Sequence, residues 1–145
     1  MRLAKNFFTK EEEAQIVQAI QNAEEKTSAE IRVHIENFCF TNPINCAKKV
    51  FIKNQMHLTE NRNGVLFYFA VISKKLAIIG DIGIYQKVSP ELWNHLTQKL
   101  ISALKHNNHK AETLCECILI IGSELAKYFP PSIDNPNELS NEISY

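Results

Sequence analysis

The chain has 145 residues, of which 45% are hydrophobic and 22% charged, as in one ordinary folded domain. Its 16 basic residues balance its 16 acidic residues, so no excess of positive charge indicates binding to nucleic acid or to an anionic membrane surface. The longest unbroken apolar stretch covers residues 65–72, far fewer than the ~20 residues of a membrane-spanning helix. The first residues lack the apolar core of a signal peptide. We therefore expect a cytoplasmic domain without membrane insertion.

The first half of the chain predicts helices that alternate with a strand. Thr9 and Glu12 have the spacing of a capping box, which opens a helix that runs to about residue 25. Residues 28–36 alternate between apolar and polar side chains, as in a strand with one buried face. Pro43 suits the first turn of a second helix, which extends to about residue 58.

The second half predicts a hairpin followed by two helices. Residues 64–72 and 76–80 have strand composition and a short polar link, and the first strand is apolar on both faces, which predicts a central position. Ser89 and Pro90 begin a helix that breaks at 106–110. A last helix follows over 111–129, although its CILIIG segment is also compatible with a short buried strand. Residues 131–145 are polar and patternless, which predicts a disordered tail after a single domain over 1–130.

This order of elements predicts an α/β fold, a three-layer α/β/α sandwich with a small mixed sheet. A helix connects the strand at 28–36 to the strand at 64–72, so these two should be parallel, with a right-handed crossover. The hairpin then adds an antiparallel third strand.

The hairpin also predicts a polar site at its base. The start of its first strand lies beside the end of its second, so residues 60–64 and 80–83 should meet. Arg62 can bind a phosphate or carboxylate through its two-pronged guanidinium. The side chains that offer oxygen ligands to a hard cation are Asp81, Asn61, Asn63 and Glu60.

Glycines accompany these polar residues at both corners of the hairpin base. Their lack of a side chain allows close backbone approach or positive φ angles, and they are Gly64, Gly80 and Gly83. The alternative interpretation is that both corners are only turns, because Asn, Asp and Gly are the ordinary residues of turns.

Other polar residues form weaker candidates. Glu30, Arg32, His34 and Glu36 share one strand face, where an ion-pair ladder is the plain interpretation. The functional alternative makes His34 and Glu36 a metal or acid/base pair at the carboxyl end of a parallel strand. His106 and His109 lie at a helix end, where they suit the dipole.

The cysteines and two phenylalanines add two further expectations. The four cysteines have no metal-binding spacing, so we expect reduced thiols that are mostly buried. Phe38, Cys39 and Phe40, in the loop over 37–42, would form an exposed apolar contact for a protein partner.

Three segments within residues 7–130 carry a family resemblance: FFTKEEEAQIVQAIQNAEEKTSAEIRVHIE, RNGVLFYFAVISKKLAIIGDIGIYQKV and YFP. Together they closely resemble the TPM-domain family, in its branch of small soluble bacterial members. The resemblance implies an α/β/α sandwich with a mixed sheet. Relatives in the thylakoid lumen are associated with photosystem II repair and described as acid phosphatases that bind calcium, an animal relative is a receptor accessory protein, and soluble bacterial members have been linked to divalent metals. The matching motif residues are Arg62, Asn63, Gly64, Gly80, Asp81 and Gly83.

Three functions follow as hypotheses. The favoured one is a noncatalytic domain that binds calcium or magnesium weakly at the hairpin base and acts through an unknown protein partner. The alternative is a metal-dependent phosphomonoesterase that uses Asp81 and Arg62, although only one carboxylate is firmly placed there. The third is an interaction domain without a ligand that uses the loop at 37–42.

Overall fold

The computed structural model describes residues 3–106, 109–131 and 139–145. The helices and strands within these residues are α1 (Lys10–Glu24), β1 (Glu30–Glu36), α2 (Pro43–Lys53), β2 (Gly64–Ala70), β3 (Lys75–Gly80), α3 (Ile82–Tyr85), α4 (Pro90–Lys105) and α5 (Lys110–Ala126). Two short 3₁₀ turns, η1 (Ala4–Asn6) and η2 (Met56–Leu58), complete the order. None of the described helices is long and apolar enough to cross a membrane.

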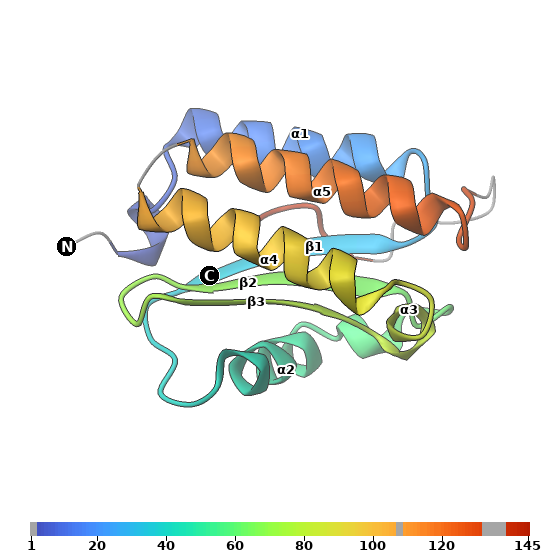
Figure 1. The fold of residues 1–145 in the computed structure, drawn as a ribbon, viewed down its shortest axis with the longest axis horizontal. Helices are drawn as coiled ribbons and strands as arrows, with labels where there is room; N and C mark the ends of the chain where they lie inside the picture. The colour runs from blue at the N-terminus through green and yellow to red at the C-terminus, as the bar shows by residue number, and fades with distance from the viewer. Residues whose placement is uncertain (1–2, 107–108, 132–138) are drawn as a thin grey trace.

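The three strands form one mixed sheet in the order β1-β2-β3, with β1 parallel and β3 antiparallel to β2. Helices α1, α4 and α5 cover one face of this sheet and α2 covers the other (Figure 1). The predicted three-layer α/β/α sandwich is therefore confirmed, as are the parallel first pair and the hairpin.

β2 is central because both of its faces are apolar. All its residues are buried. Phe67 packs into the core beneath α1 and α5, whereas Leu66 and Tyr68 pack into the core beneath α2. Burial on both faces leaves no solvent-exposed side for this strand, which therefore carries neighbours on both edges.

Local signals start α1, α2 and α4 where the sequence predicts them. The Thr9 hydroxyl accepts a hydrogen bond from the backbone N–H of Glu12, and the Glu12 carboxylate accepts one from the N–H of Thr9, which completes the capping box. The CILIIG segment is part of helix α5 and not a strand. The second predicted helix ends earlier than expected, at Lys53, and η2 follows it.

The Glu24 carboxylate, at the end of α1, forms a hydrogen bond with the start of β1. The backbone N–H of Ile31 donates to Glu24 Oε2 at 2.9 Å. Burial raises the pKa of Glu24 to about 7, the hydrogen bond from Ile31 opposes this shift, and the charge of Glu30 adds to it.

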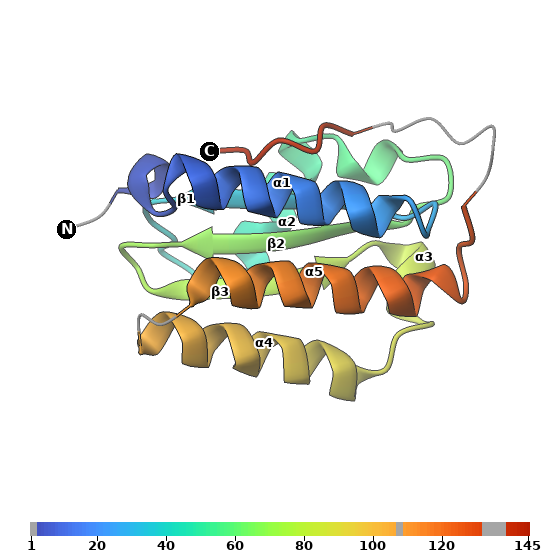
Figure 2. The same ribbon diagram turned by 90° about the horizontal axis from the view of Figure 1, so that it is seen from above.

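The last residues pair with the open edge of β1. Ser144 donates its N–H to Val33 O at 3.0 Å and accepts from Ile35 N–H at 2.9 Å, and Ile143 is buried. The end of the chain, dark red in Figure 2, lies on the β1 side of the sheet. The expectation of a disordered tail over 131–145 does not describe residues 139–145, because Ile143 supplies an apolar anchor and β1 supplies unpaired backbone groups. Residues 132–138 lie outside the described residues.

The prediction of four reduced cysteines is wrong for one pair. Cys39 and Cys46 form a disulfide, with their Cα atoms 6.2 Å apart, which connects the loop after β1 to the first turns of α2. The turn into α2 brings the two side chains together, and the spacing alone did not reveal this. Cys115 and Cys117 are thiols, and burial raises the pKa of Cys117 to about 11.

We predict that Gly122→Ala destabilises the chain. A Cβ at this position would lie 2.7 Å from the Cβ of Ala23, where α5 crosses α1. Overpacking of about 1–3 kcal/mol exceeds the gain in helix propensity of about 1 kcal/mol. Urea unfolding should show a lower free energy of unfolding. The neighbouring Ser123→Ala, at an exposed position of the same helix, should be neutral or slightly stabilising, and equal stabilisation by both variants would contradict the close packing.

Candidate functional site at the hairpin base

Antiparallel pairing brings the two polar corners of the hairpin together. Val65 lies opposite Gly80 in the register, and the N–H of Asp81 donates to Gly64 O at 2.9 Å. Beyond the strands, the N–H of Gly83 donates to Arg62 O at 2.9 Å. The expected meeting of residues 60–64 with 80–83 is therefore present in the structure.

Arg62 and Asp81 form a two-pronged ion pair at this junction. Arg62 Nε lies 2.8 Å from Asp81 Oδ2, and its Nη2 lies 2.9 Å from Oδ1. The hydrogen bonds to Asp81 raise the pKa of Arg62. The carboxylate is 5% exposed and the arginine side chain 47%, so the acid lies inside and its partner covers it from the surface.

Asp81 has a second role as the N-cap of α3. Its Oδ1 accepts a hydrogen bond of 2.7 Å from the N–H of Ile82. This four-residue helix was not predicted, because a single turn has no periodicity to detect. Both carboxylate oxygens of Asp81 therefore accept hydrogen bonds within the protein, from Arg62 and from the N–H of Ile82.

The two asparagines of the corner have different surroundings. Asn63 is buried, and its Nδ2 donates to Ser28 O at 3.2 Å, which holds the turn against the start of β1. Asn61 and Glu60 are exposed. Of the four predicted oxygen ligands, Asp81 and Asn63 are thus buried in structural roles, and the other two lie at the surface.

Gly83 is the glycine on which the corner depends most. A Cβ there would lie 2.6 Å from the carbonyl oxygens of both Asn61 and Arg62. No glycine has a positive φ angle, whereas Arg62 itself has φ 50°. The predicted close approach is present, but the left-handed residue of the corner is the arginine.

The described residues contain no group of three or more His, Cys, Asp or Glu side chains that could hold a metal ion. The predicted oxygen ligands at the hairpin base are therefore the buried side chains of Asp81 and Asn63, backbone carbonyls and the exposed side chains of Glu60 and Asn61. Such a mixture suits a hard cation only in a loose, partly hydrated site.

His34 belongs to a second polar cluster on β1. Its Nδ1 lies 2.7 Å from Ser144 Oγ, and its Nε2 lies 3.0 Å from Glu36 Oε1. The Tyr68 hydroxyl donates to the other Glu36 oxygen, and Asn54 Nδ2 donates to Ser144 Oγ at 3.2 Å. The expected contact between His34 and Glu36 is present, whereas no pattern in the sequence indicated Ser144 or Asn54.

Burial sets the ionisation of this cluster. It lowers the pKa of His34 below its ordinary value, and the hydrogen bond and charge of Glu36 oppose this shift only in part. Burial and the bond to Glu36 raise the pKa of Tyr68. A neutral histidine between a serine and a carboxylate therefore holds the end of the chain on β1.

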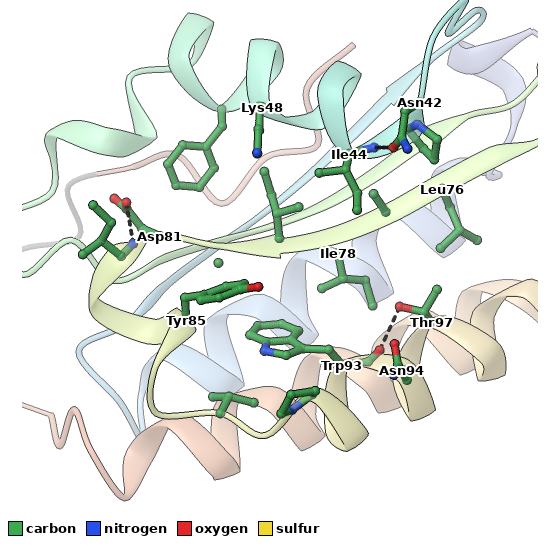
Figure 3. A pocket seen from close by; sticks show the side chains of 18 of the residues that line it. Asn42, Ile44, Lys48, Leu76, Ile78, Asp81, Tyr85, Trp93, Asn94 and Thr97 are labelled. Atoms are coloured by element: carbon green, nitrogen blue, oxygen red, sulfur yellow. Dashed lines mark hydrogen bonds between the residues drawn. The ribbon is translucent and has the colours of Figure 1, made fainter.

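An apolar groove adjoins the hairpin base, and the sequence did not predict it. It has a volume of about 1120 Å³ and runs along β3 between α2 and α4 (Figure 3). Asp81 lies at one end of the groove and Asn42 at the other (Figure 3). Phe38 and Phe40, in the nearby loop, are both exposed and stack with centroids 5.5 Å apart.

The TPM domain family matches residues 3–112 of the chain. The chain is also similar to the BA42 protein of the psychrophilic bacterium Bizionia argentinensis, at 41% identity and a TM-score of 0.85, over 95% of this chain and 94% of that one. The N-terminal domain of the cg2496 protein from Corynebacterium glutamicum matches at 11% identity and a TM-score of 0.60, over 97% and 82% respectively, which shows the fold alone. No curated protein matches.

We predict that Gly83→Ala lowers the free energy of unfolding by about 2 kcal/mol, because the new methyl group forces apart the backbones of the two corners. Gly64→Ala is the matched control, since its Cβ would meet no atom closer than 3.4 Å. Chemical denaturation of both variants measures the difference. Equal effects of the two substitutions would contradict the close approach at Gly83.

We predict that His34 makes stability fall as the pH falls. The pKa of His34 in the folded state lies below the unfolded value of 6.5. As the pH falls, the unfolded state therefore binds a proton before the folded state does, and this shifts the equilibrium toward unfolding. Glu36, Lys53 and Arg32 are the charges that act on it. Urea unfolding between about pH 7 and pH 5 should show a steeper loss for the wild type than for His34→Gln. Parallel pH profiles would refute the assignment.

Proposed function

This chain belongs to the TPM domain family, and from that premise we propose that it is a noncatalytic binding domain, which holds Ca²⁺ or Mg²⁺ weakly at the hairpin base and acts through a protein partner. The observation that carries the proposal is the adjacency of the Asp81 carboxylate to the turn at Asn61 and Arg62. Carboxylate, amide and carbonyl oxygens are the donors that hard divalent cations take.

Arg62 supports a weak site because it already neutralises the buried carboxylate of Asp81. A divalent cation that reaches Asp81 has to displace the guanidinium, and the exposed arginine side chain can swing toward solvent. Competition of this kind for the Asp81 carboxylate is consistent with dissociation constants of about 0.1–1 mM for the cation.

The phosphomonoesterase alternative has less support. Arg62 would bind the phosphate, but both prongs of its guanidinium are bound to Asp81. Metal-dependent phosphatases hold their ions with several acidic or histidine ligands, and the described part of the chain gathers no such group. We therefore favour binding over turnover.

We predict that Arg62→Ala tightens calcium binding by about fivefold, because it removes the guanidinium that competes with the cation for Asp81. The measurement is an NMR titration of the ¹⁵N-labelled chain with CaCl₂, in which the amide shifts should cluster at residues 60–64 and 81–84. Asp81→Asn should abolish these shifts while amide signals elsewhere keep their folded positions.

Lys74→Ala is the matched control for the loss of positive charge. Lys74 also has a left-handed backbone, with φ 55°, but it lies at the opposite end of the hairpin. Its loss should leave the calcium affinity unchanged. Equal tightening by both variants would indicate a general charge effect, and shifts scattered over the acidic first turn of α1 would indicate nonspecific binding; either result would refute the proposed site.

A further inference from the structure

The groove along β3 is larger than a site for a small molecule needs. Its volume of about 1120 Å³ exceeds the range of about 300–1,000 Å³ that is usual for small ligands. It is open along its length, with α2 on one side, α4 on the other and β3 between them (Figure 3). This shape suits a length of polypeptide.

The floor of the groove is an unpaired strand edge. Asp81 N–H points toward β2, because it donates to Gly64 O. Backbone groups in an antiparallel pair alternate in direction, so Leu76, Ile78 and Gly80 direct their N–H and C=O groups away from β2. No strand of the described residues pairs with this side of β3.

The opposite edge of the sheet shows how this chain satisfies such groups. There Ser144 exchanges backbone hydrogen bonds with Val33 and Ile35 and forms a parallel bridge beside His34. An extended segment therefore already adds to the β1 edge, whereas the β3 edge lies open in an apolar groove.

The two walls of the groove differ in charge. Tyr85 of α3 is 71% exposed, and with Trp93 of α4 it makes one wall apolar. The wall on α2 contains the apolar side chains of Ile44, Phe51 and Ile52, and Lys48 projects from it toward β3 as the one basic residue of the lining (Figure 3). Helix α2 contains three lysines and no acidic residue, and the one acid of the lining, Asp81, is neutralised by Arg62.

We propose that this groove binds an extended segment of a partner protein, which pairs with the β3 edge as a fourth strand and alternates apolar with acidic side chains. Alternate side chains of a strand point to opposite faces. The apolar ones then lie against Tyr85 and Trp93, and the acidic ones face Lys48. Main-chain pairing provides affinity and the walls provide selectivity. This inference rests on the partner-binding half of the proposed function and is independent of the cation.

The probe is a seven-residue peptide of alternating valine and glutamate with blocked ends, titrated into the full ¹⁵N-labelled chain. We expect amide shifts along residues 76–80 and slower hydrogen exchange at the Ile78 N–H, which the added strand would cover. The same peptide with N-methyl groups on alternate residues cannot pair with a strand edge, and it should bind at least about tenfold more weakly. Equal binding of the two peptides would overturn strand pairing.

Two matched pairs of variants test the walls. Tyr85→Ala should weaken peptide binding by about fivefold or more, whereas Tyr128→Ala, an exposed tyrosine outside the groove, should leave it unchanged. Lys48→Glu should weaken it by about fivefold, whereas Lys49→Glu changes the charge of the same helix from a position outside the lining and should have little effect. If the two variants of a pair lose the same peptide affinity, the role assigned to that wall of the groove is wrong.

The peptide titration is run in EDTA and again in excess CaCl₂, so that failure of the groove proposal can be distinguished from failure of the cation-site proposal. Peptide binding in EDTA supports the groove even if no calcium shifts appear at residues 60–64, and calcium shifts without peptide binding support only the cation site. Absence of peptide shifts up to millimolar concentration overturns the groove proposal. Concentration-dependent shifts at 76–80 without peptide would identify a second copy of the chain as the occupant and also overturn it.

Discussion

Burial of β2 on both faces is the constraint from which the rest of the structure follows. A strand with no exposed face needs a layer of helices on each side and a neighbouring strand on each edge. The crossover through α2 supplies β1 on one edge, and the turn at residues 71–74 supplies β3 on the other. Because β3 returns beside the start of β2, the same pairing that completes the core also places Asp81 beside Arg62.

The ion pair between Arg62 and Asp81 then determines what the hairpin base offers to a ligand. An isolated buried carboxylate would be a strong ligand and also a strong destabilising charge. The guanidinium neutralises it from the surface, and the Ile82 N–H satisfies it from within. The hairpin base is therefore stabilised by this ion pair and offers only a weak site for a cation. Asp81 also lines the groove along β3.

The sequence predicted the features that depend on pattern or chain topology. Alternation identified β1, composition identified the β2–β3 hairpin, and the hairpin implied the meeting of Asp81 with the turn at Arg62. The unpredicted features depend on side-chain conformation or on contacts between distant residues. Arg62 has a left-handed backbone and binds the Asp81 carboxylate through its guanidinium, and Ser144 pairs with β1 across more than a hundred residues. Neither has a local signal, and the four residues of α3 are too few to show a period.

Ser144 on β1 also limits how copies of this chain can assemble through the sheet. A sheet with two open edges can add neighbours head to tail without end, which is the geometry of a fibre. Within the described residues Ser144 occupies the β1 edge, so β3 is the one strand edge of the sheet without a neighbouring segment. Two copies that paired through their β3 edges would therefore leave no open edge for a third.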